Sequence, residues 1–280
     1  MNLFENILFP VDFSHRSEAL TPFVAATANR FQARLTLLHV LDLPRAGEEP
    51  PFADLTEEFS QKLRSFGADA FAGRFVQHAL RTGRPAKEIV RFVEDENVDL
   101  VVMPTHGFTR FRQLLLGSVT ASVLHDASCA VWTSAHCEEA GAVHADVQTV
   151  VCAIDMSRAS IGVLAKAREV AEAYGAALHV VHSVPAVDPR FYSEVAAHAH
   201  RFLVDSAHRE YHTLAGAADV DVPLVVLEGP GLASSIAAKC KAEGADLLII
   251  GRGHVKGVLG RLRTNSHDLI RLSPCPVLSL

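Results

Sequence analysis

Short apolar stretches alternate with longer amphipathic ones along the whole chain. Near the start, "ILFPVD" and "LTLLHV" flank the segment "VAATANRFQA", whose apolar residues recur at helical spacing. The apolar stretches are rich in valine, isoleucine and leucine, which is typical of strands buried on both faces of a parallel sheet. Five such stretches occur in each half of the chain, so the pattern predicts β-α-β-α order with helices on both faces of each sheet.

The second half of the sequence repeats the first. Asp12 matches Asp155 and His39 matches His182, and later segments match at almost the same offset. An even duplication of this kind predicts an α/β protein of two tandem Rossmann-like domains, each with a five-stranded parallel sheet. The predicted domains cover residues 1–138 and 147–280.

The repeated strand ends place polar side chains where a ligand of such a fold would bind. Ser14 and Ser157, just after the first strand of each half, are suited to cap the following helix. Ligands of open α/β sheets bind beyond the carboxyl ends of the strands, where the strand order reverses. Asp12 and the loop after Met103 both emerge there, so we expect a binding site at this edge.

The stretch "HGFTRFRQLLLGSV" after the fourth strand has the chemistry of an anion cradle. Gly107 lets backbone amides approach a phosphate, Gly117 and Ser118 begin a helix with unpaired N–H groups, and Arg110 or Arg112 neutralises charge. The spacing equally fits a plain strand end, a helix start and a solvated cationic face, so it leaves both interpretations open.

Several motifs together resemble the universal stress protein (UspA) family. They are "PVDFS" after the first strand, "LLHV" in the second, "VDLVVMPTHG" around the fourth, "LLLGSVTASVL" at the last helix and "CAVWTS" in the fifth strand. The resemblance covers essentially the whole chain in two copies, as in a tandem member. Nucleotide-binding members carry the pattern G-x2-G-x9-G-[ST].

The family resemblance implies an adenine nucleotide, ATP with Mg, as the ligand of the first domain. Asp12 and Val40 would contact the nucleoside at the ends of the first two strands, and Met103 would lie at the end of the fourth. Residues implied around the phosphates are Gly107, Arg110, Gly117, Ser118 and Val119.

Both copies depart from the family pattern. Its first glycine falls on Pro104, which has no N–H to donate. In the second copy Gly251 keeps the first position, but His254 and Thr264 replace the other two glycines, and Thr264 to Ser266 are suited to cap the last helix. We therefore expect a degenerate second site. Its residues are Asp155, Gly251, Gly253, Thr264 and Asn265.

Histidine and cysteine give weaker signals. Asp205, His208 and His212 share one face of a predicted helix, but no compact third and fourth ligand accompanies the histidines, so we predict an exposed polar face and no metal site. His39 and His182 are expected to be half-buried strand residues with backbone partners, and the recurring Cys129 and Cys275 to be core residues.

Composition excludes several functional classes. The net charge of −6 and pI near 6.2 disfavour nucleic acid as the main partner. No apolar run reaches the length of a membrane span, and "MNLFENILFPVDF" resembles a first strand more than a signal peptide. The five scattered cysteines are odd in number and lack CxxC spacing, which favours the cytoplasm.

These features favour a nucleotide-binding stress-response or signalling protein. Two alternatives stay open: a nucleotide-free interaction scaffold, and a slow ATPase or phosphotransferase. The chain has no Walker motif and no paired carboxylates beside the loop, so no catalytic residue is assigned and an enzyme is the less favoured interpretation.

The final strand of each half is short and apolar, and such edges favour pairing. We expect the two halves to form an intrachain pseudo-dimer, with a homodimer of the whole chain as a further option.

Overall fold

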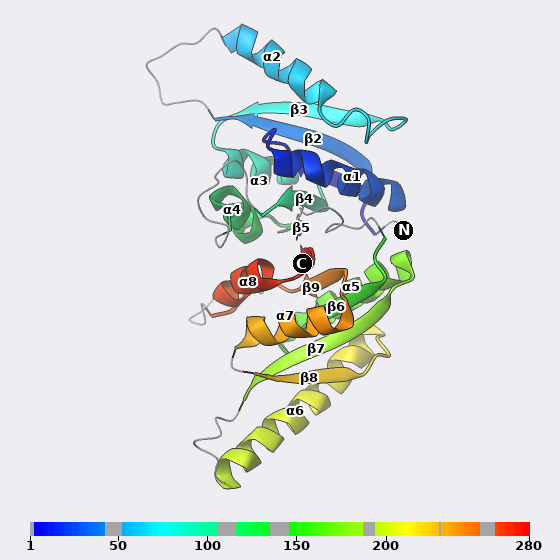
Figure 1. Ribbon diagram of the computed structural model, residues 1–280, viewed down its shortest axis with the longest axis vertical. Helices are drawn as coiled ribbons and strands as arrows, with labels where there is room; N and C mark the ends of the chain where they lie inside the picture. Colours follow the sequence, from blue (N-terminus) through cyan, green and yellow to red (C-terminus); the bar gives the residue numbers. More distant parts are fainter. Residues whose placement is uncertain are drawn as a thin grey trace. The chain divides into compact units, whose positions relative to one another are not determined.

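The computed structural model describes residues 3–42, 52–105, 116–134, 146–186, 194–229, 231–252 and 261–280 (Figure 1). The chain divides into two compact units, Met1–Ala145 and Asp146–Leu280. Within the described residues, each unit has five strands and four helices in the alternating order that the hydrophobic pattern predicts.

The first unit is a parallel sheet in the order β3-β2-β1-β4-β5. Its central strand β1 pairs with both β2 and β4, with Ile7 opposite Leu35 on one side and Leu100 on the other. The elements are β1 (Asn6–Pro10), α1 (His15–Arg30), β2 (Arg34–Leu41), α2 (Phe52–Ser65), β3 (Val76–Thr82), α3 (Pro85–Asp95), β4 (Leu100–Pro104), α4 (Ser118–Asp126) and β5 (Ala130–Ser134).

The second unit repeats this topology in the order β8-β7-β6-β9-β10, again with parallel pairs. The elements are β6 (Thr149–Ala153), α5 (Ser160–Tyr174), β7 (Ala177–Pro185), α6 (Glu194–Ala218), β8 (Leu224–Gly229), α7 (Leu232–Glu243), β9 (Leu247–Ile250), α8 (Arg261–Leu272) and β10 (Val277–Ser279). Pairing of the two halves across their last strands stays a prediction.

Helices cover both faces of each sheet (Figure 1). Right-handed crossovers place α1 and α2 on one face of the first sheet, and the reversal of strand order after β3 places α3 and α4 on the other, where they pack together. In the second unit α5 packs with α6, and α7 with α8. Among the described helices, none combines the length and apolar character that crossing a bilayer requires.

A half-buried carboxylate fixes the amino-terminal ends of the central strands in both units. Asp99 accepts hydrogen bonds from the backbone N–H groups of Glu5 (2.7 Å) and Asn6 (3.1 Å). Asp246 makes the same contact with the amides of residues 148–149 at 2.9 and 3.0 Å. Burial raises the pKa of Asp99, and the hydrogen bonds from Glu5 and Asn6 offset part of that effect. These two equivalent aspartates have a structural role and lie at the amino-terminal ends of the strands, opposite the carboxyl edge of the sheet.

Only one of the two predicted serine caps exists. Ser14 caps α1, because its Oγ accepts from the N–H of Ser17 at 3.3 Å. The prediction for Ser157 is wrong: α5 begins at Ser160 after the cap residue Ala159. Residues 157–160 instead form a tighter turn, closed by a 2.9 Å bond from Ser160 N–H to the Ser157 carbonyl.

Candidate functional site

The first unit has a cavity of about 270 Å³ at the carboxyl edge of its sheet. It lies where the strand order reverses between β1 and β4, the usual ligand position in this topology. The ends of β1, β2 and β4 and the starts of α3 and α4 form its wall. Lining residues include Val11, Asp12, Ser17, His39, Val40, Ile89, Met103, Pro104, Gly117, Ser118, Val119 and Thr120.

Asp12 organises the turn between β1 and α1. Its Oδ1 accepts three hydrogen bonds, from the backbone N–H of Ser14 (3.0 Å) and from the hydroxyls of Ser14 and Ser17 (2.6 Å each). Phe13 within this turn has a φ of 60°, a left-handed conformation that is rare for a bulky residue. All three of these bonds fall on Oδ1, and Asp12 lines the cavity.

His39 is held as a neutral, structural ring. Its Nδ1 lies 2.7 Å from the carbonyl oxygen of Val11, so Nδ1 carries the proton and donates. Burial lowers the pKa of His39, and the nearby Lys62 ammonium lowers it further, while Val11 and Asp12 act in the opposite direction. The ring stacks on Phe59 with centroids 5.1 Å apart. His182 makes the equivalent bond in the second unit, from Nδ1 to the Ile154 carbonyl at 2.9 Å. The predicted backbone partners of both histidines are therefore confirmed.

The amino terminus of α4 faces the ends of β1 and β4. Gly117 is the cap residue, and its N–H donates to the Thr105 carbonyl at 2.8 Å. Thr120 Oγ1 donates to the Pro104 carbonyl at 3.0 Å. These two bonds fix the helix start against the strand end. The next amides, of Ser118 and Val119, are first-turn N–H groups without an intrahelical acceptor, and they carry the positive end of the helix dipole.

The structure brings most of the predicted site residues together. Asp12, Val40, Met103, Gly117, Ser118 and Val119 all line the one cavity. Gly107 and Arg110 lie outside the described residues. Pro104 also lines the cavity, where it supplies a carbonyl to Thr120 and no donor. The ligand roles of these residues stay predictions.

Two features of the site were missed by the sequence reasoning. Ser17 completes the hydroxyl shell of Asp12, and its signal was available, since a serine follows the aspartate by five residues in both copies, as Ser17 and as Ser160. The left-handed residue after the aspartate also recurs, as Phe13 and Met156 (φ 61°). No residue type in the sequence marks that conformation, because glycine and asparagine, which favour it, occupy neither position.

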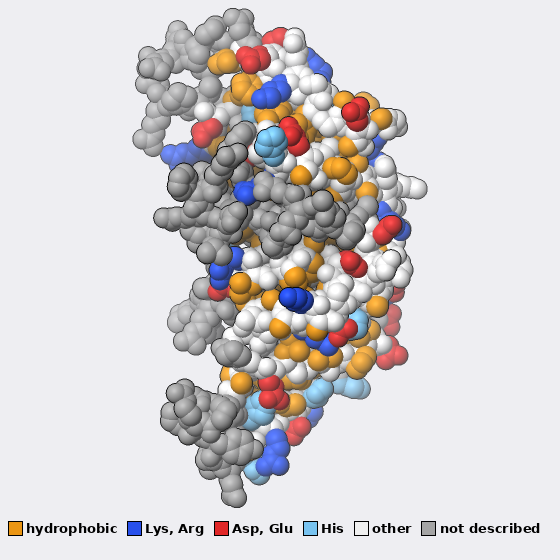
Figure 2. Space-filling view, in the orientation of Figure 1, with side chains coloured by type: hydrophobic (Ala, Val, Ile, Leu, Met, Phe, Trp, Pro, Cys, Tyr) orange, Lys and Arg blue, Asp and Glu red, His pale blue; other side chains and the backbone are white. Residues whose placement is uncertain are grey.

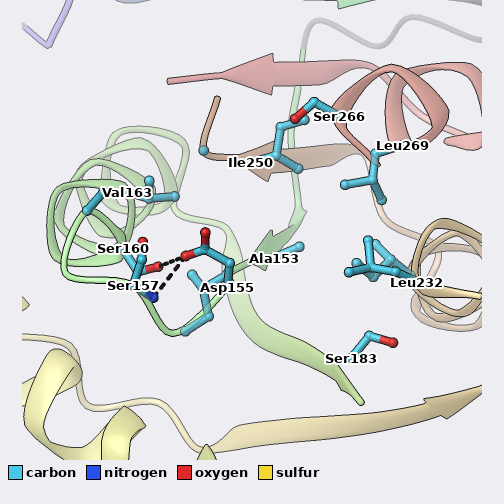
Figure 3. Close-up of a pocket in the computed structure, with 14 residues that line it drawn as sticks. Ala153, Asp155, Ser157, Ser160, Val163, Ser183, Leu232, Ile250, Ser266 and Leu269 are labelled. Carbon is cyan, nitrogen blue, oxygen red and sulfur yellow. Dashed lines mark hydrogen bonds between the residues drawn. The ribbon is translucent and has the colours of Figure 1, made fainter. Parts of the chain in front are cut away.

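The second unit keeps the turn but has a smaller cavity. Asp155 Oδ1 accepts from the backbone N–H of Ser157 (3.0 Å) and from Ser160 Oγ (2.9 Å), as Figure 3 shows. The equivalent cavity measures about 60 Å³. Its wall is made mainly of aliphatic side chains and serine hydroxyls. They include Val163, Ser183, Leu232, Ile250, Ser266 and Leu269.

Burial acts to raise the pKa of Asp155, but the hydrogen bonds from the two serines outweigh it, and the net pKa lies below the ordinary value. Gly251 lines this cavity at the end of β9. A Cβ there would lie 3.0 Å from Val163 Cγ2, so glycine permits the close approach of β9 and α5. The hydrogen bonds from Ser157 and Ser160, which both fall on Oδ1, favour the ionised form of the Asp155 carboxylate.

The predicted cap at Thr264 is wrong, because α8 begins one turn earlier, at Arg261. Arginine and leucine before Thr264 are good helix formers and extend the helix toward the loop. Thr264 and Asn265 thus belong to the helix, although their side chains lie outside the described residues, as does Gly253. Ser266 lines the small cavity.

The histidine-rich helix α6 has the predicted exposed face. Asp205, His208 and His212 are all exposed, and Figure 2 shows basic, acidic and histidine side chains over the part of the molecule where α6 lies. Within the described ranges, no group of three or more His, Cys, Asp or Glu side chains is arranged to hold a metal ion. Cys129 and Cys275 are buried core residues, as predicted.

Comparison with known proteins decides the family. The model of the universal stress protein family matches residues 3–134 and again residues 146–280. The chain belongs to the universal stress protein family. A universal stress protein of Methanocaldococcus jannaschii is 30% identical over 144 residues, which cover 44% of this chain and 89% of that protein. One from Thermus aquaticus is 30% identical over 133 residues, covering 46% of this chain and 97% of the relative.

The same architecture is present in a solved structure. A universal stress protein from Archaeoglobus fulgidus has a TM-score of 0.72 and 23% identity, with 99% of this chain and 96% of that chain covered. The likeness shows a shared fold across both copies. The chain is thus a tandem universal stress protein with two α/β units.

Proposed function

We propose that the first unit of this universal stress protein binds one adenine nucleotide, ATP with Mg, and that the protein acts in a stress response or in signalling. The observation that carries the proposal is the 270 Å³ cavity at the strand reversal, which is lined by Asp12, Val40 and the start of α4. A carboxylate, a strand-end backbone and a helix amino terminus suit the sugar, base and phosphates of a nucleotide in turn.

Each part of the cavity has a distinct role in this proposal. Oδ2 of Asp12 would accept a hydrogen bond from a ribose hydroxyl, because Oδ1 is already used by the turn. Backbone groups of Val40 would meet the base. The amides of Ser118 and Val119 and the Ser118 hydroxyl would donate to phosphate oxygens, whose charge the Mg ion accompanying ATP would partly neutralise.

One nucleotide per chain is expected. The cavity of the second unit measures about 60 Å³, against about 270 Å³ in the first, and leaves little room for a nucleotide. The four cysteines among the described residues are buried and form no disulfide with one another, which supports a reducing compartment such as the cytoplasm.

The test is the stoichiometry of ATP binding by calorimetry, with ADP and AMP compared alongside. Wild type should bind one ATP per chain, and Gly117→Asp should lose it, since a carboxylate at the start of α4 repels phosphate. Aspartate is a good cap residue, so this variant should fold at least as well as wild type. Thr264→Asp, at the matching position of the second copy, is the control and should leave ATP binding unchanged.

Two results would overturn the proposal. Absence of ATP binding in wild type would mean that the cavity does not hold the nucleotide and would favour a nucleotide-free scaffold. Unchanged binding in Gly117→Asp would place the phosphates away from α4.

A further inference from the structure

Helix α6 is packed against its own unit along only half of its length. In the carboxyl-terminal half, one face is buried against the sheet; its residues are Ala207, Tyr211, Leu214, Ala215 and Ala218. Between residues 197 and 206 no side chain is buried. In Figure 1 the amino-terminal half of α6 runs past the end of strand β8. Helical propensity alone gives a segment of this length little stability, so burial of its outer face would stabilise it.

The orientation of this overhanging half is fixed by one contact. Nε2 of His200 lies 3.0 Å from Oε1 of Glu228 on β8, so the His200 side of the helix faces the sheet. Successive helix residues are about 100° apart. Phe202 therefore lies about 200° from His200, on the outer side of the helix.

The outer side carries an apolar stripe. Ala199, Phe202, Leu203 and Ser206 follow the i, i+3, i+4, i+7 spacing of a buried helix face. Yet the side chain of Phe202 is 64% exposed and that of Leu203 is 44% exposed. Two large apolar residues flanked by two small ones, of which Ser206 accepts a 3.4 Å hydrogen bond from Arg209 Nη2, give a surface into which another helix can pack.

Charged residues border the stripe on one side. Arg201 and Asp205 are both exposed, and neither has an ion-pair partner among the described residues. They are placed symmetrically about Leu203, two positions before and two after it. A helix laid antiparallel across Leu203 would meet opposite charges if it had the same sequence.

We propose that α6 is a homodimer surface, on which the stripe of Ala199, Phe202, Leu203 and Ser206 packs antiparallel against the same stripe of a second copy. The two-fold axis passes beside Leu203 and brings Arg201 of each copy to Asp205 of the partner subunit, so the ion pair forms twice. Because a two-fold axis of this kind keeps the same flank of both helices together, both charged positions meet.

The contact is short, roughly 11 Å from Ala199 to Ser206 along each helix at 1.5 Å per residue. Interfaces of this size bury little area and are weak. The dimer should therefore be concentration-dependent and should dissociate on dilution. The charged flank makes the association specific, since other apolar helices would leave Arg201 and Asp205 without partners.

Sedimentation velocity of the full chain over a range of concentrations tests the surface. Wild type should pass from monomer to dimer, and Phe202→Glu should remain monomeric at every concentration. Phe75→Glu is the matched control, because Phe75 is 89% exposed but belongs to the first unit and not to α6; its dimerisation should match wild type. A wild-type monomer throughout, or a persisting dimer in Phe202→Glu, would overturn the proposal.

Charge exchange tests the antiparallel register. Arg201→Asp alone and Asp205→Arg alone each turn two attractive contacts into two repulsive ones, which should weaken the dimer about tenfold or more. The double exchange restores opposite charges and should return the dissociation constant to within about threefold of wild type. Additive weakening in the double variant would refute the register, and circular dichroism of each variant separates this from unfolding of α6.

Discussion

The left-handed conformation of Phe13 makes a stability prediction whose sign depends on the backbone alone. A residue with a β-carbon at a φ of about 60° costs roughly 1–2 kcal/mol relative to the right-handed region, whereas glycine carries almost no such cost. Replacing Phe13 by alanine or by glycine removes the same ring contacts, with His39 at 4.5 Å and Phe66 at 5.7 Å. The difference between the two variants therefore isolates the backbone term.

We expect Phe13→Gly to be more stable than Phe13→Ala by about 1 kcal/mol, a net value after the extra unfolded-state entropy of glycine. Urea denaturation followed by tryptophan fluorescence measures it. Trp132 is the only tryptophan of the chain and is 1% exposed in β5. Its ring meets Phe23 of α1 edge-on at 5.1 Å, so its fluorescence reports on unfolding of the first unit.

The matched control is an ordinary helix position with the opposite sign. Arg91 is exposed in the middle of α3, where glycine should be about 1 kcal/mol less stable than alanine. Equal stability of the two Phe13 variants, or an advantage for alanine, would refute the claim that the turn after β1 imposes a left-handed residue.

Three further predictions concern two hydrogen-bonded carboxylates and one buried thiol. Hydrogen bonds from two serines hold the pKa of Asp155 below its ordinary value, so the stability that the ionised Asp155 contributes is complete above the ordinary pKa and is lost as pH falls through the folded-state pKa. In thermal unfolding at several pH values, Asp155→Asn should therefore lose less stability than wild type as the pH falls. An unchanged loss of stability in acid would contradict this. Asp99→Ala should lower the free energy of unfolding by about 1–3 kcal/mol, because it leaves two strand amides without an acceptor. Urea denaturation followed by Trp132 fluorescence measures this loss. The control Asp95→Ala, which removes an exposed ion pair, should lower the free energy of unfolding by less than about 1 kcal/mol. Burial raises the pKa of Cys152 to about 12, so this thiol should resist Ellman's reagent in the native protein and react after denaturation; labelling of Cys152 in the native state, seen by peptide mass spectrometry, would count against its burial.

The order of elements and the position of the cavity could be predicted from the sequence because both depend on local patterns. Apolar runs and their spacing indicate strands and helices directly. The duplication adds a second measurement of each. Asp12 and Gly117 are 105 residues apart, yet both could be placed at one edge, because parallel strands all end on the same side of a sheet.

Helix starts and cavity size could not be predicted in the same way. Ser157 and Thr264 both have the side chain of a good cap residue. A tight turn after Ser157 delays the start of α5 to Ser160, whereas good helix formers before Thr264 bring the start of α8 forward to Arg261. Cavity volume depends on how side chains from four elements pack against one another. No local sequence pattern reports that packing. The altered glycine pattern of the second copy therefore predicted a changed site but not the small volume of its cavity.

The two units together separate the structural role of the aspartate turn from its role in binding. Both units keep an aspartate, a left-handed residue and the serine five positions after the aspartate, although the second cavity is small. The turn is therefore needed to start the first helix whether or not a ligand binds.

What differs is the opposite wall of the cavity. Leu232 stands where the first unit has Pro85, and Ser183 where it has Val40, while His254 and Thr264 replace the second and third glycines of the family pattern. Under the proposed function, nucleotide binding in the first unit would depend on that opposite wall and on α4, with Asp12 contributing only its Oδ2. Transplanting the turn alone would not create a second nucleotide site, whereas rebuilding the wall of the second unit around its intact turn is the change that would.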